Sequence, residues 1–293
     1  MPAQIIDGKL VARSVRQALK PRIARLKEQS ITPGLVAVLV GDDPASQTYV
    51  ASKARACEKL KLFSQVIRMD AKTSQQELIA VVKRLNADSS VHGILVQSPL
   101  PSGIDELSVT LAIDPTKDVD GFHPHNVGMM LIGRGGLLPC TPHGIIKLLE
   151  HYQIDPAGKE VVIVGRSNIV GKPLAALLVQ KQAMANATVT VSHSRSANLP
   201  AITSRADILI AAIGRPEFVS ADMVREGAVV VDVGINRVED TASDKGYRLV
   251  GDVHFTPVAE KASYITPVPG GVGPMTIAML MSNTVEAAER VTY

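Results

Sequence analysis

Short, uninterrupted runs of apolar residues constrain the fold of this chain more than any other feature. The runs of strand length are 35–40, 93–97, 161–164, 208–212 and 229–233, and segments with helical periodicity follow several of them. A strand that is apolar along its whole length has to be covered on both faces, as in a parallel sheet with helices on each side. The sequence therefore predicts an α/β fold built on parallel sheets.

The composition fits such a fold and limits the classes of function. The chain has 293 residues, enough for two medium domains, with 46% apolar residues, 3% aromatic residues and no Trp. Aliphatic side chains must therefore build the interior, which suits helices packed on a sheet. The net charge is +3, and Lys and Arg form no run with interleaved aromatic residues. Nucleic acid is therefore not expected as a partner.

Cys57 and Cys140 are the only two cysteines. They stand far apart and outside any spacing typical of metal sites, so we expect reduced thiols, no bound metal and a cytoplasmic location. The first residues carry no apolar signal region, and no apolar stretch reaches the length of a membrane span. We therefore expect a soluble protein without a membrane partner.

Two α/β series follow one another, and a stretch rich in Pro and Gly follows each. The expected elements of the first series are a helix at 9–28, a strand at 35–40, a helix after Asp43-Pro44, a strand at 63–68, a helix at 74–86 and a strand at 93–97. Those of the second are a helix at 142–151, a strand at 161–164, a helix at 171–184, strands at 188–192, 208–212 and 229–233, and a helix at 275–290. Residues 98–140 show little periodicity, and a long irregular stretch inside a compact domain is usually functional.

Tyr49 and Lys53 fall on the helix that begins after Asp43. An acidic N-cap followed by Pro44 at the first helical position is a typical helix start. Residues four positions apart share one face of a helix, so the phenol ring and the ammonium group point into the same space. The pair is either part of a site or a solvated lysine beside a half-buried tyrosine.

A strand, a glycine turn and a helix start occupy residues 161–173. Gly165 lets the chain turn sharply and Gly171 lets the helix pack closely, so that free N–H groups can face a pyrophosphate. The spacing departs from GxGxxG, and a tight turn without a ligand is the alternative.

The end of the next strand bears on the choice of dinucleotide. NAD-binding proteins usually carry an acidic residue there, whereas this chain has Ser194 and Arg195. Together with Arg166, these residues favour the additional phosphate of NADP over NAD, because a carboxylate would repel that phosphate.

Three further features could contribute to a binding site. Gln97 ends an apolar strand, where side chains line the crevice of a parallel sheet. Asp118 and Asp120 are either turn-forming residues or carboxylates that grip the paired N–H groups of a heterocycle. The segment 267–274 contains three glycines, which suit a strained connection or close approach of the backbone to a flat ligand.

Taken together, these motifs resemble those of the bifunctional methylenetetrahydrofolate dehydrogenase/cyclohydrolase family. The resemblance covers nearly the whole chain, with the motifs in the same order. It is carried by Tyr49-xxx-Lys53, Val96-Gln97-Ser98-Pro99-Leu100-Pro101, Lys117-Asp118-Val119-Asp120-Gly121-Phe122, Pro139-Cys140-Thr141-Pro142, Gly165-Arg166-Ser167, Val170-Gly171-Lys172-Pro173, Asp232-Val233-Gly234-Ile235-Asn236, Gly251-Asp252-Val253 and the segment 267–276. Ser98 replaces the leucine usual in the family, and a few extra residues stand at 181–186.

The resemblance implies roles for individual residues. Lys53 would be the principal catalytic residue, with Tyr49 against the folate and Gln97 holding or tuning the lysine. Asp120 would grip the pterin ring. The other residues implied at the folate are Val96, Ser98, Pro269, Gly270, Gly271 and Gly273. Those implied at NADP are Gly165, Arg166, Ser167, Ser194 and Ile235, to which the charge argument adds Arg195.

The resemblance also implies the organisation and the reaction. Residues 1–140, completed by a C-terminal helix at 274–293, would form an α/β folate-binding domain. Residues 141–273 would form a Rossmann-type NADP domain, through which the chain forms a homodimer. Hydride would pass from 5,10-methylenetetrahydrofolate to NADP⁺, and water would then convert the methenyl product to 10-formyltetrahydrofolate.

Two other enzyme classes and one non-catalytic class compete with this interpretation. Short-chain dehydrogenases also carry Tyr-xxx-Lys, but after the nucleotide loop and in the same domain. Shikimate-dehydrogenase-like enzymes share the order of the two domains, yet they do not require the 118–121 loop or the 267–274 segment. A nucleotide-binding regulator without activity is the third alternative.

Overall fold

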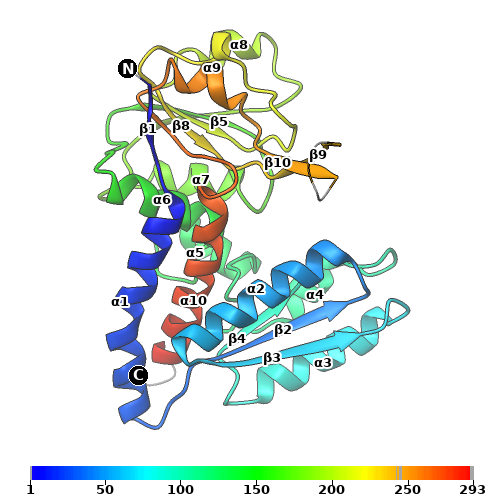
Figure 1. The fold of residues 1–293 in the computed structure, drawn as a ribbon. Helices are drawn as coiled ribbons and strands as arrows, with labels where there is room; N and C mark the ends of the chain where they lie inside the picture. The colour runs from blue at the N-terminus through cyan, green and yellow to red at the C-terminus, as the bar shows by residue number, and fades with distance from the viewer. Residues whose placement is uncertain (1, 242, 244–245, 291–293) are drawn as a thin grey trace. The chain divides into compact units, whose positions relative to one another are not determined.

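The computed structural model describes residues 2–241, 243 and 246–290. The chain divides into two compact units (Figure 1). Residues 13–140 and 277–293 form one, named here the three-stranded unit, and residues 1–12 and 141–276 form the other, the six-stranded unit. Two helices, α1 (Gly8–Glu28) and α10 (Val272–Arg290), each begin in the six-stranded unit and end in the three-stranded unit.

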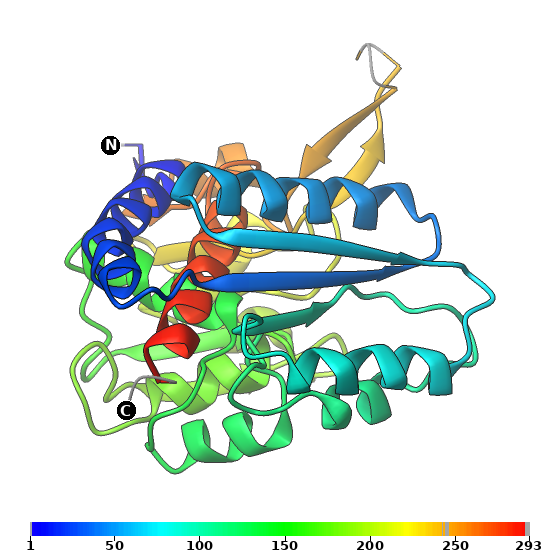
Figure 2. The ribbon, with the colours of Figure 1, turned by 90° about the horizontal axis from the view of Figure 1, so that it is seen from below.

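The sheet of the three-stranded unit has the order β3-β2-β4, and all its strands are parallel. The strands are β2 (Gly34–Val40), β3 (Phe63–Met69) and β4 (Gly93–Val96), and the helices α2 (Pro44–Leu60) and α3 (Gln75–Ala87) connect them. Figure 2 shows α2 on one side of this sheet and α3 on the other. Every residue of β2 is buried, which explains its continuous apolar sequence. The predicted parallel β-α-β-α-β arrangement is confirmed.

Local capping fixes where the connecting helices begin. The Asp43 carboxylate accepts a hydrogen bond from the Ser46 N–H, and Pro44 occupies the first turn of α2. Ser74 and Glu77 form a reciprocal capping box at the start of α3. These contacts satisfy N–H groups that have no partner inside the helix.

The expectation of an irregular stretch at 98–140 is wrong in part, because two short helices lie within it. They are α4 (Glu106–Ala112) and α5 (Pro124–Leu131). Asp105 caps α4 by accepting from two backbone N–H groups, and His123 caps α5 through its Nδ1 atom. Helices of two turns are too short for a repeating apolar pattern to identify them.

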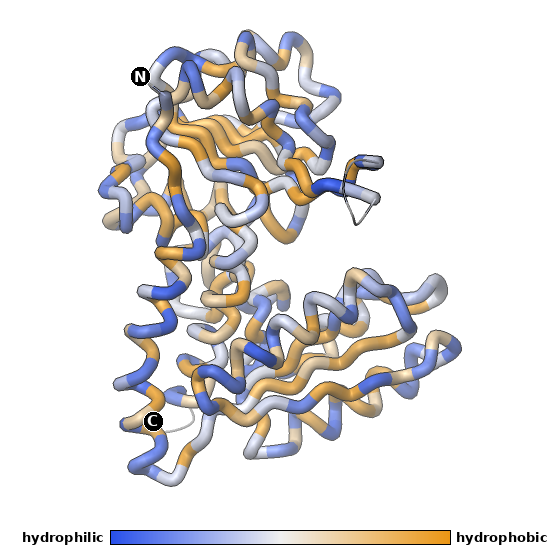
Figure 3. The backbone as a smooth tube through the Cα atoms, viewed as in Figure 1, coloured by the Kyte–Doolittle hydropathy of each residue, from blue (hydrophilic) through white to orange (hydrophobic). Residues whose placement is uncertain are grey.

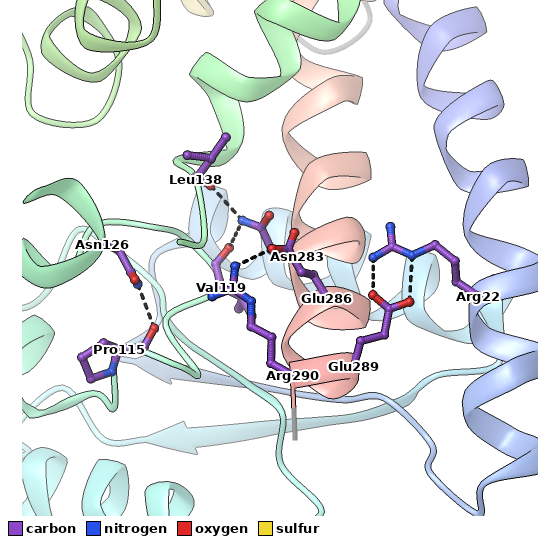
Figure 4. Close-up of polar contacts among 9 residues, drawn as sticks. All are labelled: Arg22, Pro115, Val119, Asn126, Leu138, Asn283, Glu286, Glu289 and Arg290. Atoms are coloured by element: carbon purple, nitrogen blue, oxygen red, sulfur yellow. Dashed lines mark hydrogen bonds and ion pairs between the residues drawn. The ribbon is translucent and has the colours of Figure 1, made fainter. Parts of the chain in front are cut away.

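The C-terminal helix α10 begins at Val272, three residues earlier than predicted, and its expected end at 291–293 lies outside the described residues. It packs beside α1, where the Arg22 guanidinium and the Glu289 carboxylate form an ion pair at 2.6 Å (Figure 4). Met275, Met279 and Met281 are buried, as expected for residues that fill the core.

The six-stranded sheet has the order β1-β11-β8-β7-β5-β6, and its strands are parallel. They are β1 (Gln4–Ile5), β5 (Glu160–Val164), β6 (Thr188–Ser192), β7 (Ile208–Ala211), β8 (Val229–Asp232) and β11 (Tyr264–Ile265). Hydrophobic residues are concentrated along the strands of both sheets (Figure 3). The predicted parallel sheet of this Rossmann-like unit is confirmed.

The helices of the six-stranded unit are short apart from α6. They are α6 (Cys140–His151), α7 (Gly171–Leu178), α8 (Leu199–Thr203), the 3₁₀ turn η1 (Ala221–Met223) and α9 (Phe255–Ala259). An antiparallel hairpin of β9 (Asn236–Glu239) and β10 (Tyr247–Val250) extends from this unit (Figure 2). The sequence analysis did not predict this hairpin.

Helix α7 is shorter than the predicted 171–184. It ends at Leu178, and the residues after it form turns, with φ of 58° at Met184 and 57° at Asn186. The Ala187 N–H returns to the Leu178 carbonyl at 3.0 Å and closes this turn. Apolar residues continue past the helix end, which is why the pattern alone extended it. The extra residues at 181–186 belong to this turn.

Residues 1–12 belong to the six-stranded unit, whereas the sequence analysis placed them in the predicted folate-binding domain, 1–140. The reason is strand pairing, since Gln4 and Ile5 of β1 pair in parallel with Tyr264 and Ile265 of β11. A strand of two residues leaves no periodic signal in the sequence. Within the described part of the chain, no helix is both long enough and apolar enough to cross a membrane.

Candidate active site

Lys53 and Gln97 meet in the three-stranded unit. Lys53 lies on α2, which follows β2, and Gln97 directly follows β4, the neighbour of β2 in the sheet. The Lys53 Nζ donates a hydrogen bond to the Gln97 Oε1 at 3.0 Å, and both side chains are half-buried. The Gln97 Nε2 donates to the Ser98 carbonyl at 2.6 Å, which turns the amide oxygen toward the lysine. The sheet order therefore joins two motifs that lie 44 residues apart.

Tyr49 lies one turn before Lys53 on α2 and is 46% exposed. Its neighbour Val50 is buried, so Tyr49 lies at the solvent-facing side of the helix and Val50 on the side that packs against the core. An exposed aromatic ring next to a half-buried ammonium group can stack on a flat ligand. The tyrosine is therefore more exposed than a half-buried packing residue would be.

The two aspartates of the 118–121 loop have different environments. Asp118 is buried, and its Oδ2 accepts hydrogen bonds from the His123 N–H at 2.7 Å and the Asn126 Nδ2 at 2.9 Å. The interpretation as a turn-forming residue therefore holds for Asp118. Asp120 is half-buried, and among the described residues none donates a hydrogen bond to its carboxylate.

Burial raises the pKa of the Asp120 carboxyl, the nearby Asp118 raises it further, and the positive charge of Lys53 opposes both effects. Lys53 is thus close enough to Asp120 for their charges to interact. Val96 is half-buried and Ser98 is exposed, and these two residues flank Gln97 at the end of β4. The structure therefore brings together Lys53, Gln97 and Asp120 at the carboxyl end of the small sheet.

The glycine turn in the six-stranded unit has the predicted geometry. A Cβ added at Gly165 would lie 2.1 Å from the Ala212 carbonyl oxygen, and one added at Gly171 would lie 2.1 Å from the Gly165 oxygen. Both positions therefore exclude any larger residue. The Ser167 Oγ accepts a hydrogen bond from the Val170 N–H at the start of α7.

The turn after β6 contains Ser194 and Arg195. The His193 Nδ1 accepts a hydrogen bond from the Arg195 N–H at 3.1 Å, and the Ser196 Oγ accepts from the His193 N–H at 3.0 Å. Arg166 and Arg195 are exposed, and neither takes part in an ion pair within the described ranges. Two cations without a carboxylate partner at the carboxyl ends of β5 and β6 suit a phosphate group.

Asp232 has a role that sequence reasoning missed. It is buried at the end of β8 and accepts hydrogen bonds from three backbone N–H groups, each at 2.9 Å. These donors belong to Gly234, Asp252 and Val253. Burial raises the pKa of Asp232 to about 7, although the three N–H groups act in the opposite direction.

Asp252 is the partner of Asp232 and is also fully buried. Its Oδ2 accepts from the N–H groups of Ile213 and Gly214 at 2.7 and 2.8 Å, and its Oδ1 accepts from the Asn236 Nδ2 at 2.9 Å. The two carboxylates thereby hold the turns that follow β7 and β8. Ile235, which the sequence analysis selected as a cofactor contact, stands on the second turn and is 45% exposed.

Two glycines were the signal that could have revealed this pair of carboxylates. A Cβ added at Gly251 would lie 1.8 Å from the Asp232 Oδ2, and one added at Gly234 would lie 2.2 Å from the Asp252 Oδ1. Each glycine follows or precedes an aspartate in the sequence, so Gly-Asp and Asp-Val-Gly patterns mark places where a carboxylate approaches the backbone.

The glycines of the 267–274 segment approach other parts of the same unit closely. A Cβ added at Gly271 would lie 2.7 Å from the Pro267 oxygen, and one added at Gly8 would lie 1.7 Å from the Gly271 oxygen. Gly270 has a φ of 115°, and Gly273 stands close to the Ile235 side chain. Pro269 precedes this turn. The close contacts of Gly271 are therefore contacts with the protein chain itself, as in the alternative of a strained connection.

Both cysteines are free and buried. Burial raises the pKa of the Cys57 thiol to about 11 and that of Cys140 well above its ordinary value. Within the residues that the structure describes, no three His, Cys, Asp or Glu side chains gather closely enough to hold a metal ion.

Comparison with known families decides what this arrangement belongs to. Residues 6–120 match the sequence profile described as "Tetrahydrofolate dehydrogenase/cyclohydrolase, catalytic domain", and residues 139–292 match "Tetrahydrofolate dehydrogenase/cyclohydrolase, NAD(P)-binding domain". The chain belongs to the tetrahydrofolate dehydrogenase/cyclohydrolase family. Lys53, Gln97 and Asp120 fall within the first profile, and the glycine turn falls within the second.

Relatives within the family are similar along their whole length. The bifunctional protein FolD of Moorella thermoacetica is 58% identical over 290 residues, which cover 99% of this chain and 100% of that protein. The bifunctional FolD of Campylobacter jejuni has a solved structure that is 49% identical, covers 99% of each chain and has a TM-score of 0.93. The FolD of Trypanosoma brucei, solved with NADP and an inhibitor, is 38% identical with a TM-score of 0.94, covering 100% of this chain and 99% of that one. Membership of this family favours the folate interpretation over the shikimate-dehydrogenase-like alternative.

Proposed function

We propose that the chain is a bifunctional one-carbon folate enzyme. It oxidises 5,10-methylenetetrahydrofolate to the 5,10-methenyl compound with NADP⁺ and then hydrolyses that compound to 10-formyltetrahydrofolate. Family membership supports both activities. The observation that carries the proposal is the contact of Lys53 with Gln97, beside a carboxylate of Asp120 that receives no hydrogen bond from the described residues.

The carboxylate of Asp120 fits the pterin ring. A carboxylate has two oxygens and can accept from two parallel N–H groups, such as the ring N–H and the amino group of a pterin. Asp118 does not fit this role because it is buried and its Oδ2 already accepts from the His123 N–H and the Asn126 Nδ2. The exposed ring of Tyr49 would stack on the flat part of the folate. Val96 and Ser98 would line the wall on either side of Gln97.

The oxidation needs little chemistry from side chains. Ring nitrogen lone pairs stabilise the cationic methenyl product, so the main requirement is that the one-carbon bridge is held in the correct orientation. NADP⁺, when bound, supplies the carbon that accepts the hydride. Asp120 and Tyr49 would orient the folate for this step, and no base has to remove a proton.

The hydrolysis requires a proton carrier, and Lys53 is suited to this role. Water adds to the methenyl carbon, and a proton has to leave the attacking water and reach the nitrogen of the opening ring. The Gln97 amide oxygen accepts a hydrogen bond from one N–H of Lys53, and the Gln97 N–H₂ group donates to the Ser98 carbonyl. Gln97 would therefore hold the Lys53 nitrogen toward the substrate without adding a charge.

The residues of the six-stranded unit fit a dinucleotide with an additional phosphate. Gly165 and Ser167 stand at the start of α7, whose N–H groups suit a phosphate. Arg166, Ser194 and Arg195 are exposed and would hold the ribose phosphate of NADP. Ile235 would contact the nicotinamide end, and the segment from Pro269 through Gly270, Gly271 and Gly273 would contact the folate.

We propose that the three-stranded unit supplies Lys53, Gln97 and Asp120 to the folate site and that the six-stranded unit supplies the NADP site, and we propose a homodimer formed through the NADP-binding unit. The resemblance to the family supports both assignments. Two free cysteines are consistent with a reducing compartment such as the cytoplasm.

A single assay tests the proposal. NADPH absorbance is followed after 5,10-methylenetetrahydrofolate is added with NADP⁺, and in parallel with NAD⁺. We expect NADPH to form, with a slower or absent reaction with NAD⁺, and the methenyl compound to be hydrolysed in turn. No reduction with either nucleotide, together with NADP binding, would instead support a non-catalytic regulator.

A further inference from the structure

Asn283 connects two segments of the three-stranded unit that lie far apart in the sequence. It stands on α10, is 1% exposed, and its Nδ2 donates hydrogen bonds to the Val119 and Leu138 carbonyl oxygens, each at 2.8 Å (Figure 4). The Cys140 thiol lies beside them and donates to the same Val119 oxygen at 3.3 Å. A side chain from the last helix thus holds the 118–121 loop against the segment that leads into α6.

The chemistry of this position fits an amide. Two carbonyl oxygens converge on one buried point, and each needs a donor because an unsatisfied buried carbonyl is costly. The Asn283 nitrogen carries two N–H groups and no charge. A lysine would supply donors but would bury a cation, and a hydroxyl would supply only one donor.

The contact with Val119 bears directly on Asp120. The Val119 carbonyl belongs to the planar peptide unit that joins Val119 to Asp120, so fixing that oxygen fixes the plane from which the Asp120 side chain projects. Gly121 continues with a φ of 76°, and a Cβ added there would lie 2.5 Å from the Leu138 carbonyl carbon. The backbone on both sides of Asp120 is therefore held against the 138–140 segment.

The rest of the loop is held by other contacts, and the Asp120 side chain stays available. Asp118 is fixed by the His123 N–H and by Asn126, which also donates to the Pro115 carbonyl (Figure 4). The Ile94 N–H of β4 donates to the Lys117 carbonyl at 2.8 Å and joins the loop to the sheet. All these contacts restrain backbone or Asp118, and none of them uses the Asp120 carboxylate.

We infer that Asn283 is a positioning residue for folate: by holding the Val119–Asp120 peptide, it aims the Asp120 carboxylate at the pterin. The inference rests on the proposed role of Asp120. It predicts that loss of the two donors weakens folate binding in both reactions, because both use the same pterin position, while NADP binding does not change.

The test compares two variants of α10. Asn283→Leu keeps the approximate shape and removes both donors. Thr284→Val is the matched control, because Thr284 is equally buried on the same helix and its hydroxyl donates only to the Leu280 carbonyl within the helix. For Asn283→Leu we expect KM for the folate to rise about tenfold in both assays with a smaller change in kcat, and the Kd for NADP to match the wild type. Thr284→Val should keep the wild-type KM values.

An unchanged folate KM in Asn283→Leu, or an equal rise in Thr284→Val, would overturn the inference. If Asn283→Leu is too unstable to assay, Asn283→Ser is measured in the same way; it retains one donor, and its KM should rise by a smaller factor. The wild-type assay separates this inference from the proposed function. An inactive wild-type enzyme would refute the function, whereas an active one with a normal Asn283→Leu and a raised KM in Asp120→Asn would refute only the role of Asn283.

Discussion

The loops at 118–121 and 232–236 look alike in the sequence, since each begins with Asp-Val, but they use their carboxylates in opposite ways. In the first loop, Asp118 accepts from neighbouring donors and Asp120 is left without a donor among the described residues. In the second, the Asp232 carboxylate accepts from the N–H of Asp252, which lies on another segment. The Asp252 carboxylate in turn accepts from three further donors. The supply of N–H groups therefore distinguishes the Asp120 carboxylate, which we propose as a ligand-binding group, from the carboxylates that hold the backbone.

The difference predicts which reaction each region controls. The first loop and Lys53 lie in the unit proposed to bind folate, so changes there should affect the reactions of the folate. The Asp232–Asp252 pair shapes turns in the unit proposed to bind NADP, so changes there should affect only the reaction that needs NADP. Bifunctionality supplies an internal control, because methenyl hydrolysis requires no nucleotide.

The largest effect is expected for Lys53→Met. The variant keeps the length of the side chain and removes the nitrogen that would carry the proton, so methenyl hydrolysis should fall by about 10³-fold, within the range for loss of an acid–base group. NADP binding should stay normal. The measurement is the decay of methenyl absorbance, with NADP titration as the control. Full hydrolysis in this variant would remove Lys53 from the mechanism.

Asp252→Asn should have a smaller and more selective effect. The amide places an N–H₂ group where Ile213 and Gly214, or Asn236, now donate, so the turns after β7 and β8 lose part of their support. We expect the Kd for NADP to rise about tenfold, with methenyl hydrolysis close to the wild-type rate.

Asp207→Asn is the matched control for that variant. Asp207 lies in the same unit, just before β7 at the opposite end of the sheet, where its carboxylate accepts from the Glu160 N–H and pairs with Arg225. The same chemical change there should leave both NADP binding and hydrolysis unchanged. Equal losses in the two variants would mean that the Asp232–Asp252 pair has no special relation to the nucleotide.

The smallest effect is expected from His143, on α6 in the six-stranded unit. Its Nδ1 is buried, with no hydrogen-bond partner in the described part of the chain, and burial lowers its pKa from 6.5 to about 4. Between these values the unfolded chain binds a proton that the folded chain does not. The contribution of the neutral His143 to the free energy of unfolding should therefore be fully present above pH 6.5 and be lost as the pH falls toward 4.

His143→Leu removes this contribution, so its denaturation midpoint should change less than that of the wild type between pH 7 and pH 4. Urea titrations at several pH values measure the difference. Parallel curves for the two proteins would show that His143 is not responsible for the acid sensitivity. Unlike the two aspartate loops, this histidine should affect neither ligand.

The strands that the sequence predicts well are those that carry their own signal. β2 is buried along its whole length, as are residues 161–164 of β5 and 229–231 of β8, and these residues therefore appear as continuous apolar runs. By contrast, β1 and β11 have two residues each, and they exist because β1 pairs with β11 and β11 pairs with β8. Strands of that kind depend on tertiary context, which a local pattern does not contain.

The candidate site divides in a similar way. Tyr49 and Lys53 could be placed on one helix face because a capped helix start precedes them, and Gln97 could be placed at a strand end. Their meeting depends on the order β3-β2-β4, which local sequence does not specify. Asn283 could have been noticed as a polar residue within an apolar helix, since buried polar side chains are the informative exceptions. Its partners Val119 and Leu138 could not have been named.

The central claim is that one folate site, with Asp120 as its pterin ligand, serves both reactions. The most direct test is to measure methylene oxidation and methenyl hydrolysis side by side in Asp120→Asn. Because the amide loses one charged acceptor, kcat/KM should fall about 10–100-fold in both assays, with the Kd for NADP unchanged. A loss confined to one reaction, or wild-type values in both, would contradict the claim.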